Sequence, residues 1–567
     1  MAGDNDRFDM TQGKTATVDP GKTAMERSFL SRPMQLAFDD GLIDLETSVF
    51  DYGCGRGGDV DRLRKIGIEA NGWDPSHSPD SERMEADVVN LGFVINVIED
   101  RNERIAVLHA AWSLARSGMV VAARPTWEAR EVNGKPHGDG LITSKGTFQK
   151  FYDQEELRSL LDTVLETKTV AAGPGIFYAF KTELSRQRVL ATLSRDRPTQ
   201  PTRTLAELIL EQHRELLEPV ASWVETNQKL PSATDLPNGD DIVEEFGSIR
   251  SAFAVVRRAT DAIKWAGVDL GTRKTSERRF EQNLDVLQPL IDFLTERGRL
   301  PHPGELTNEE AVNENLGSIR RAYSLIRKVT GTARWSEFEQ GARDEFTTYL
   351  AVTTLSGRPR FSDLPEDLQH DAKDFFGSHK AACEVADQLL FGAGNLEAIS
   401  AASESAELGK LTPEAFYVHV SALHALPPLL RVYEGCARSL SGRVNNATII
   451  KMHRLKPQVS YLIYPKFDRD PHPALQASVI VRLGRLDVNY RSFIDSDNPP
   501  ILHRKELFVA KDYSGYAKFE KLTTQEERAG LLSHPGIGTK VGWQNTLESA
   551  GYLIRGHRLT RDQPNRR

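Results

Sequence analysis

Apolar and polar positions divide the chain into three stretches with different periodicities. From about residue 24 to 197, short apolar runs alternate with amphipathic segments, which predicts an α/β fold. The predicted strands span 49–53, 68–73, 87–91, 119–123, 163–170 and 173–182, and the predicted helices span 26–38, 59–65, 102–114 and 153–161. Residues 1–23 are polar throughout, and we expect them to form a disordered tail.

The middle stretch, residues 198–400, has helical periodicity and contains an internal repeat. Residues 216–265 align without gaps on residues 286–335, and a more divergent third copy covers 357–391. Each copy predicts a helix, a proline-containing turn, a short helix and a second helix that begins at a Gly-Ser pair. We therefore expect an all-α repeat region here.

The last stretch, residues 401–567, predicts a separate α+β domain. An apolar helical pair is expected around Pro427, and strand-like runs follow at 447–453, 459–464, 477–488 and 506–510. The segment 522–532 predicts a helix that Thr523 or Thr524 caps.

Composition and charge narrow the class of protein. The chain has 567 residues, with 39% apolar and 27% charged residues, which is ordinary for a globular protein of several domains. No apolar run reaches a membrane-spanning length, the N-terminus has no hydrophobic signal segment, and the three cysteines are too few for a disulfide framework. We expect a cytoplasmic protein without a membrane partner.

The charge is unevenly distributed. The net charge is −8, yet residues 441–567 carry 21 Lys and Arg against 12 Asp and Glu. A basic end on an acidic chain favours an anionic partner for the last domain. The alternative is a solvated surface of mixed charge.

A glycine cluster follows the first predicted strand, at Gly53, Gly55, Gly57 and Gly58. Glycines let the backbone turn tightly and approach a ligand closely, and Asp74 at the end of the second strand is placed to accept hydrogen bonds from two ribose hydroxyls. The spacing formally matches a dinucleotide-binding loop as well as an S-adenosylmethionine loop. Asp51 decides between them, because a carboxylate at the strand tip repels a diphosphate and attracts the cationic groups of S-adenosylmethionine.

Three motifs in order, DYGCGRG at 51–57, DP at 74–75 and the segment 87–100, resemble the class I, Rossmann-like methyltransferases that use S-adenosylmethionine. The resemblance implies a final antiparallel strand at 173–182. Only 12 residues separate Asp74 from Asp87, so the third edge strand of that family has no room. The cofactor contacts that we predict are Asp51, Gly53, Cys54, Gly55, Gly57, Asp74, Asn90 and Gly92, of which the last two substitute for the missing adenine contact.

The sequence disfavours two familiar classes of DNA base methylation. Methyltransferases of exocyclic base amines carry a Pro-Pro-aromatic motif after the fourth strand of the family's sheet, where this chain has Asn90-Leu-Gly-Phe93, and the Pro-Cys nucleophile of cytosine C5 enzymes is absent. Asn96 and Glu99 are the candidate catalytic residues. The alternative is that Asn96, Glu99 and Asp100 cap the helix at 102–114.

Basic residues predict nucleic-acid contacts in two places. The repeat resembles small helical repeats attached to homing endonucleases and some helicases, which implies DNA contacts from its Gly-Ser-started helices. The residues predicted to contact DNA are Arg250, Arg257, Arg320 and Arg327 in the repeats, and Lys451, Arg454, Arg504 and Lys505 in the last domain. The alternative is a helical spacer with solvated arginines. Asp468, Asp470, His472 and His503 offer metal-binding groups, but their spacing matches no ligand pattern, so no metal site is predicted.

Over nearly its whole length, the chain resembles the methyltransferases associated with DNA phosphorothioation. Segments such as VNLGFVINVIEDRNER (89–104), SYLIYPKFDRDPHPAL (460–475) and NPPILHRKELF (498–508) carry this resemblance. It implies a bacterial defence system, with DNA and other proteins of that system as partners. The alternative is a DNA-binding scaffold or regulator of the same system whose cofactor domain is sensory or vestigial.

Overall fold

The computed structural model describes residues 29–194, 210, 213–260, 262–265, 268 and 275–561. The tail predicted at 1–23 lies outside these residues. The chain forms two compact units: the first contains the residues up to Val189 together with 440–445 and 486–489, and the second contains the remainder. Among the described residues, no helix combines the length and the apolar character needed to cross a membrane.

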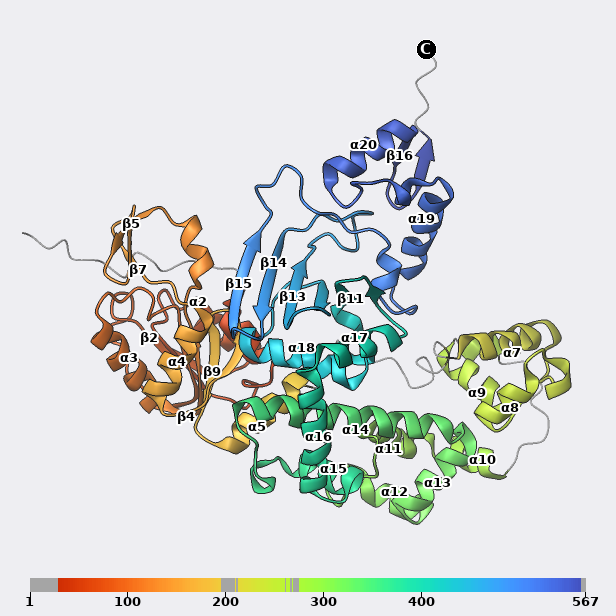
Figure 1. The fold of residues 1–567 in the computed structure, drawn as a ribbon. Helices are drawn as coiled ribbons and strands as arrows, with labels where there is room; N and C mark the ends of the chain where they lie inside the picture. The colour runs from red at the N-terminus through yellow and green to blue at the C-terminus, as the bar shows by residue number, and fades with distance from the viewer. Residues whose placement is uncertain are drawn as a thin grey trace, which may run out of the picture. The chain divides into compact units, whose positions relative to one another are not determined.

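The first unit is built on a six-stranded sheet of order β2-β1-β3-β4-β9-β8 (Figure 1). The strands are β1 (Val49–Tyr52), β2 (Ala70–Trp73), β3 (Ala86–Gly92), β4 (Ala115–Ala122), β8 (Val170–Gly173) and β9 (Ile176–Phe180). The pairs β1–β2, β1–β3 and β3–β4 are parallel, whereas β9 is antiparallel to β4 and β8. No described strand pairs with the outer edge of β2, which confirms that the short segment 74–87 holds no additional strand.

Helices cover this sheet. Because they bury its strands, the strand sequences are apolar at nearly every position. The helices are α1 (Arg32–Asp39), α2 (Gly58–Ile66), α3 (Arg101–Leu114) and α4 (Gln154–Leu165), with a 3-10 helix at Thr126–Glu131. Helix α5 (Glu183–Ser194) follows β9 and ends in the second unit. Leu108 of α3 and Leu161 of α4 pack in one core with Phe50, Val89 and Phe177 of the sheet. The strand predicted at 163–170 is wrong, because Leu157, Leu161 and Leu165 continue the buried face of α4.

A small sheet follows β4 that the sequence analysis did not predict. It consists of β5 (Gly134–His137), β6 (Gly140–Thr143) and β7 (Phe148–Gln149), and Figure 1 shows it beyond one end of the larger sheet. Arg104 of α3 holds it through two hydrogen bonds to Asp139, at 2.6 and 2.8 Å. The same guanidinium donates to the carbonyl oxygens of Ile98 and Glu99, so it joins the small sheet to the segment after β3.

The second unit begins with helices that repeat the same local structure. The first two copies contain α7 (Arg214–Asn227), α8 (Gly239–Phe246) and α9 (Ile249–Ala259), then α10 (Thr275–Gln282), α11 (Leu284–Arg297), α12 (Glu309–Leu316) and α13 (Ile319–Thr330). The long helix α14 (Ala333–Thr353) precedes α15 (Glu366–Phe376), α16 (His379–Ala393) and α17 (Leu396–Ser405). Short 3-10 turns lie at Ala233–Asp235, Ala262–Trp265, Thr354–Ser356 and Phe361–Asp363.

The Gly-Ser pair has one structural role in all three copies. Gly247, Gly317 and Gly377 end a helix in the left-handed region, with φ of 72°, 87° and 72°. The following serines, Ser248, Ser318 and Ser378, cap the next helix by accepting a hydrogen bond from the backbone N–H three residues on. A left-handed C-cap followed at once by an N-cap produces a sharp helix–helix corner.

The remainder of the second unit contains an antiparallel sheet. Its strands β10 (Lys410–Leu411), β11 (Ala415–His419), β12 (Ile449–His453), β13 (Gln458–Ile463) and β14 (Ala477–Arg482) lie side by side in chain order. Strand β15 (Asp487–Ser492) follows β14 in the order of the same sheet. The other elements are the 3-10 helix at Val420–Ala425, α18 (Pro428–Ser441), η8 (Lys505–Phe508), α19 (Tyr516–Arg528), the 3-10 turn at Leu531–Ser533, α20 (Lys540–Ala550), β16 (Tyr552–Ile554) and β17 (Leu559–Arg561).

Three local predictions in this region are wrong. Ala415–His419 is a strand rather than the first of two helices, because all five residues pair with β12. The run at 506–510 belongs largely to the 3-10 helix η8, which follows Arg504 in the left-handed region at φ 55°. Thr523 and Thr524 lie inside α19 and cap nothing; Thr523 Oγ1 donates to Glu506 Oε2 at 2.8 Å.

Candidate functional site

The glycine loop joins the carboxyl end of β1 to the start of α2. Gly53, Gly55 and Gly57 have φ of 88°, 54° and 74°, a region that disfavours other residues. A Cβ at Gly53 would lie 2.4 Å from Val94 Cγ2, so this position also lacks room for a side chain. The amides of Gly53 and Cys54 donate to the Trp73 carbonyl oxygen at 2.8 and 3.1 Å, which ties the loop to the end of β2. The loop therefore lies at the carboxyl edge of the parallel strands, where α/β folds bind ligands.

Asp51 and Asn90 form a buried pair beside this loop. The sheet register places the two residues opposite each other on β1 and β3, and Asn90 Nδ2 donates to Asp51 Oδ1 at 2.8 Å. Their exposed fractions are 5% and 2%. Burial, together with the negative charges of Asp59 and Asp74, raises the pKa of Asp51 to about 7 despite the Asn90 bond. Asn90 Oδ1 has no hydrogen-bond partner, so the pair offers a buried acceptor to a donor that is absent from the chain.

Asp74 lies at the carboxyl end of β2 and faces the loop. Its Oδ2 accepts from the Gly55 amide at 3.0 Å, and its Oδ1 accepts from the amides of Ser76 and His77, both at 2.9 Å. Burial raises the pKa of Asp74, but the hydrogen bonds from these residues outweigh it and hold that pKa below its usual value. Asp74 is therefore ionised at neutral pH, and Oδ2 retains a lone pair for a further donor such as a hydroxyl.

The start of α2 is acidic, which bears on the kind of ligand that the loop accepts. Asp59 and Asp61 occupy the first turn, and Asp59 Oδ1 accepts from the Ser31 amide at 2.7 Å. A diphosphate at this helix start would meet Asp51, Asp59 and Asp74. The sequence analysis did not predict that Asp59 raises the pKa of Asp51. The acidic first turn behind the loop could have indicated it.

Cys54 and Gly92 lie in the loop and at the end of β3. Burial and the carboxylates of Asp51 and Asp74 raise the pKa of the Cys54 thiol to about 12, so it stays protonated and is no nucleophile. A Cβ at Gly92 would approach Asn90 Nδ2 to 3.1 Å. Because the Asn90 amide is turned toward Asp51, Asn90 orients the Asp51 carboxylate. An adenine contact at Asn90 or Gly92 stays a prediction.

The candidate catalytic residues Asn96 and Glu99 contact the small β5–β7 sheet. Asn96 is buried, and its Nδ2 donates to Gln149 Oε1 at 3.2 Å while its Oδ1 has no hydrogen-bond partner. Glu99 is half-exposed, and its Oε1 lies 2.6 Å from His137 Nε2. Asp100, by contrast, caps α3 by accepting from the Glu103 amide at 2.8 Å, so the capping interpretation holds for this residue.

The arginines of the repeats that are predicted to contact DNA differ in their exposure to solvent. Arg320 and Arg327 of α13 are exposed, and Arg327 lies over the Tyr323 ring at 5.5 Å. Arg257 of α9 is half-buried, with its Nη2 3.8 Å from Glu281 Oε1, and Arg250 is half-buried. Of the four arginines predicted to contact DNA, the two exposed ones are therefore on α13.

One of the four basic residues predicted in the last domain must be withdrawn. Lys505 is 2% exposed, and its Nζ donates to the carbonyl oxygens of Phe467 and Asp470 at 2.7 Å, so it cannot reach a phosphate. Arg454 is largely enclosed and donates to Ser400, Thr412 and Glu404.

The other two predicted cations of this domain keep more exposure. Arg504 is paired with Glu527 but keeps about a third of its side chain exposed, and Lys451 is half-buried with its Nζ 5.3 Å from the Tyr417 ring.

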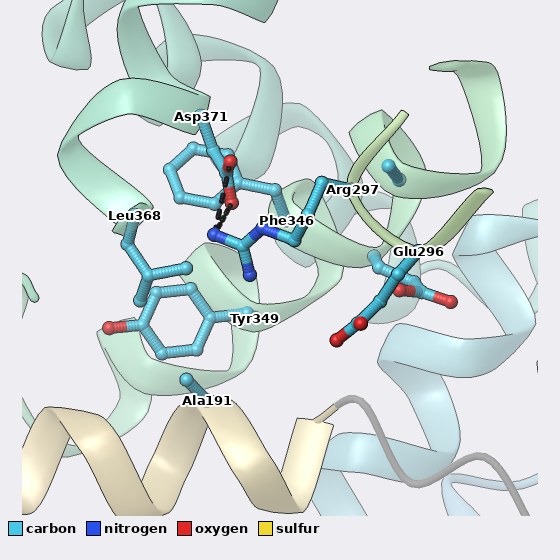
Figure 2. Close-up of a pocket in the computed structure, with 9 residues that line it drawn as sticks. Ala191, Glu296, Arg297, Phe346, Tyr349, Leu368 and Asp371 are labelled. Carbon is cyan, nitrogen blue, oxygen red and sulfur yellow. Dashed lines mark hydrogen bonds and ion pairs between the residues drawn. The ribbon is translucent and has the colours of Figure 1, made fainter. Parts of the chain in front are cut away.

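A pocket in the helical part of the second unit lies among α5, α11, α14 and α15 (Figure 2). Its lining residues are Ala191, Glu296, Arg297, Ala342, Glu345, Phe346, Tyr349, Leu368 and Asp371. Arg297 points across it toward Asp371, with Nη2 3.2 Å from Oδ2, and also bonds Asp367. Arg297 is the one cation among these lining residues, and it is already paired with Asp371 and Asp367.

Comparison with known proteins gives only a partial likeness. No family model and no curated protein sequence matches the chain. Magnesium protoporphyrin IX methyltransferase from Synechocystis PCC 6803, solved with S-adenosylmethionine, matches 26% of this chain and 77% of its own at 15% identity and a TM-score of 0.20. The 1,6-didemethyltoxoflavin-N1-methyltransferase of Burkholderia thailandensis, solved with S-adenosylhomocysteine, matches 27% and 80% at 13% identity and a TM-score of 0.20.

A third solved structure is an amino pentose methyltransferase from Micromonospora echinaspora with bound S-adenosylmethionine. It matches 29% of this chain and 94% of its own at 14% identity, again with a TM-score of 0.20. These values are too low to transfer any property of those enzymes to this chain.

Proposed function

We propose that the first unit binds S-adenosylmethionine and that the protein is a methyltransferase. The observation that carries the proposal is the buried Asp51–Asn90 pair beside the left-handed glycine loop, with Asp74 on the other side of that loop. Both the amino group and the sulfonium of this cofactor are cationic, and a cluster of carboxylates stabilises them. The same cluster opposes the diphosphate of a nicotinamide dinucleotide.

The polar atoms around the loop fit this cofactor. Asn90 Oδ1 is a buried acceptor without a partner, and Asp51 in its ionised form attracts an ammonium group. Asp74 Oδ2 retains an acceptor site for a ribose hydroxyl. When bound, the cofactor supplies an activated methyl group on a positively charged sulfur, and the chain's part is to hold and align it.

The acceptor side of the reaction is assigned to the segment after β3 and the small sheet β5–β7. We infer that Asn96 and Glu99 contact the methyl acceptor, and that the pair formed by Glu99 and His137 takes a proton from it where the acceptor carries one. Arg104 supports this arrangement, because it holds both the segment after β3 and the small sheet.

The proposed acceptor or binding partner is DNA of a bacterial phosphorothioation system, with other proteins of that system as further partners. The whole-length sequence resemblance supports this assignment, as do the exposed arginines of α13. Contacts from Arg320 and Arg327 to phosphates would be independent of sequence and would weaken with salt.

The cofactor assignment is tested by calorimetry on the full-length protein with S-adenosylmethionine and with NAD. We expect binding of the first ligand alone, and a loss of at least tenfold in affinity in Asp74→Asn, which lacks a charged acceptor for the ribose. His77→Ala is the matched control, because it removes one of the partners of Asp74 and keeps the carboxylate. Tight binding of NAD would overturn the proposal.

DNA binding is tested with the full-length protein and a salt titration. The double variant R320A/R327A is expected to bind DNA more weakly and to reduce the slope of log affinity against log salt by about two, one for each lost phosphate contact. Lys168→Ala, an exposed cation of the first unit, is the control. An unchanged slope in the double variant would remove α13 from the proposed DNA surface.

A non-catalytic scaffold with a sensory cofactor domain is the second candidate. The burial of Asn96 against Gln149 favours it, because this side chain is held in packing rather than presented to a substrate. Transfer of labelled methyl to plain and phosphorothioated DNA, and to copurifying proteins, separates the two candidates. Cofactor binding without transfer to any of these acceptors would favour the scaffold.

A further inference from the structure

Two histidines and a glutamate meet in the second unit, in a region that the proposed methyl transfer does not use. His472 lies between β13 and β14, His503 lies between β15 and η8, and Glu526 belongs to α19. One ligand-type atom from each of the three lies within 4.8 Å of the others, and this is the one such group among the described residues. Their exposed fractions are 8%, 8% and 1%.

Backbone pairing brings the two histidines together. Ala474 and Ile501 form an antiparallel bridge, and the Leu502 amide donates to the Pro473 carbonyl oxygen at 3.1 Å. The same register continued by two residues places His472 opposite His503, and their ring centroids lie 4.4 Å apart. Trp543 packs against both rings, at 4.8 and 4.7 Å.

The hydrogen bonds leave metal-binding atoms free. His503 Nε2 lies 2.8 Å from the Ile537 carbonyl oxygen, which can only accept, so Nε2 carries the hydrogen. Nδ1 is then a bare lone pair, and it is buried without a partner. A histidine that donates to a backbone carbonyl through one nitrogen and offers the other is the usual arrangement of a metal ligand.

The buried carboxylate of Glu526 also lacks hydrogen-bond partners. His472 Nε2 is 2.9 Å from its Oε1, yet neither oxygen accepts a hydrogen bond with good geometry. Burying a carboxylate without such bonds is costly unless a cation compensates it. Of the neighbouring cations, Arg504 is paired with Glu527, and Lys505 Nζ bonds the Phe467 and Asp470 carbonyl oxygens.

We propose that His472, His503 and Glu526 bind one divalent transition-metal ion, for which zinc is the best match. Two imidazole nitrogens and one carboxylate oxygen form a donor set typical of zinc, and they do not suit magnesium or calcium. The ion would join two loops and a helix that are far apart in the sequence. Because the three side chains are almost fully enclosed, the site stabilises this part of the chain.

The sequence indicated two of the three residues of this site. The histidines stood among four candidate ligands, but Asp468 accepts from Tyr513 Oη and Asp470 accepts from the His472 amide, so neither carboxylate joins the group. Glu526 takes their place, although the sequence placed it only inside the helix predicted at 522–532.

Metal content and affinity test the proposal on the full-length protein. After chelation and reloading with Zn²⁺, we expect one ion per chain by mass spectrometry of the metal, and a rise in melting temperature. Glu526→Gln, which keeps the shape of the side chain, and His503→Gln are each expected to weaken Zn²⁺ binding at least about a hundredfold. His419→Gln is the matched control, because His419 is equally buried at 8% in the same unit and bonds Ser421 instead.

A spectroscopic measurement distinguishes a built site from an adventitious one. Co²⁺ in place of Zn²⁺ should give visible absorption bands in the wild type and in His419→Gln, and none in Glu526→Gln. Equal metal uptake by the wild type and by both site variants would overturn the proposal. The proposal would also be overturned if Zn²⁺ left the melting temperature of the wild type unchanged and Glu526→Gln melted at a higher temperature than the wild type. In that case, a proton shared by Glu526 and His472 would occupy the place of the ion.

Discussion

Replacing Asp51 by asparagine is expected to change how S-adenosylmethionine binding depends on pH. In the wild type, affinity should rise with pH as Asp51 ionises around its pKa of about 7, and fall again as the amino group of the ligand loses its proton. That amino group titrates at about 7.7–8.0. Asp51→Asn keeps the size of the side chain but cannot ionise, so only the limb at low pH should disappear.

The magnitude follows from the fraction of ionised Asp51. One unit below the pKa, about one molecule in ten carries the charge, so affinity at pH 6 should be about tenfold below that of the fully ionised protein, which corresponds to ~1.4 kcal/mol. Loss of the carboxylate removes a charge-assisted interaction of about 1.5–3 kcal/mol. Near pH 7.5, Asp51→Asn should therefore bind roughly 10- to 100-fold more weakly than the wild type.

The assay is calorimetric titration at several pH values with two flanking variants. Asp59→Asn removes a negative charge that raises the pKa of Asp51, and should move the acidic limb to lower pH without abolishing it. Asp61→Asn is the control, because Asp61 lies on the same turn but is exposed. Equal affinity and an unchanged acidic limb in Asp51→Asn would refute the reasoning.

Stability gives a second measurement on the same variant. A carboxyl group whose pKa is raised on folding stabilises the folded state in its protonated form, and this contribution is lost as pH rises from about 4 to about 7. With a folded-state pKa of about 7 against an ordinary value of 3.8, the buried charge costs at most ~4 kcal/mol above pH 7. Without ligand, Asp51→Asn should therefore melt at a higher temperature than the wild type at pH 8, and the difference should vanish near pH 4.

Three further outcomes are expected. Gly53→Ala should destabilise the first unit by about 1–3 kcal/mol in urea unfolding and weaken cofactor binding, because φ is 88° and Val94 occupies the space of a Cβ; wild-type stability would contradict this. Cys54 should resist alkylation at pH 8, as judged by intact mass, because the pKa of its thiol is raised to about 12; rapid labelling of the native protein would show that a thiolate is present. Arg299→Ala should cost about 3–5 kcal/mol in urea unfolding, since it leaves Glu305 without its guanidinium and the buried Asp371 with Arg297 alone; a loss below 1 kcal/mol would mean that water replaces it.

Local signals in the sequence account for the parts of the fold that were predicted correctly. The glycines after β1, the apolar runs of β1 to β4 and the Gly-Ser corners of the repeats depend on neighbours a few residues away. The short segment between Asp74 and Asp87 excludes an additional strand by length alone. By contrast, Ala415–His419 has an apolar run that suits a helix or a strand equally, and its pairing with β12 decided for the strand.

The sequence by itself determined which side chains are available: a carboxylate at the tip of β1, another at the end of β2, and glycines between them. Only the tertiary structure decided their chemistry. Asp51 titrates near neutral pH because the folded chain buries it and brings the charges of Asp59 and Asp74 beside it, and the Asn90 hydrogen bond offsets only part of this effect. Likewise, Glu526 joins two histidines through a sheet-like bridge that no local pattern encodes. Backbone preference acts over a few residues, whereas burial and charge depend on whichever segments the folded chain brings together.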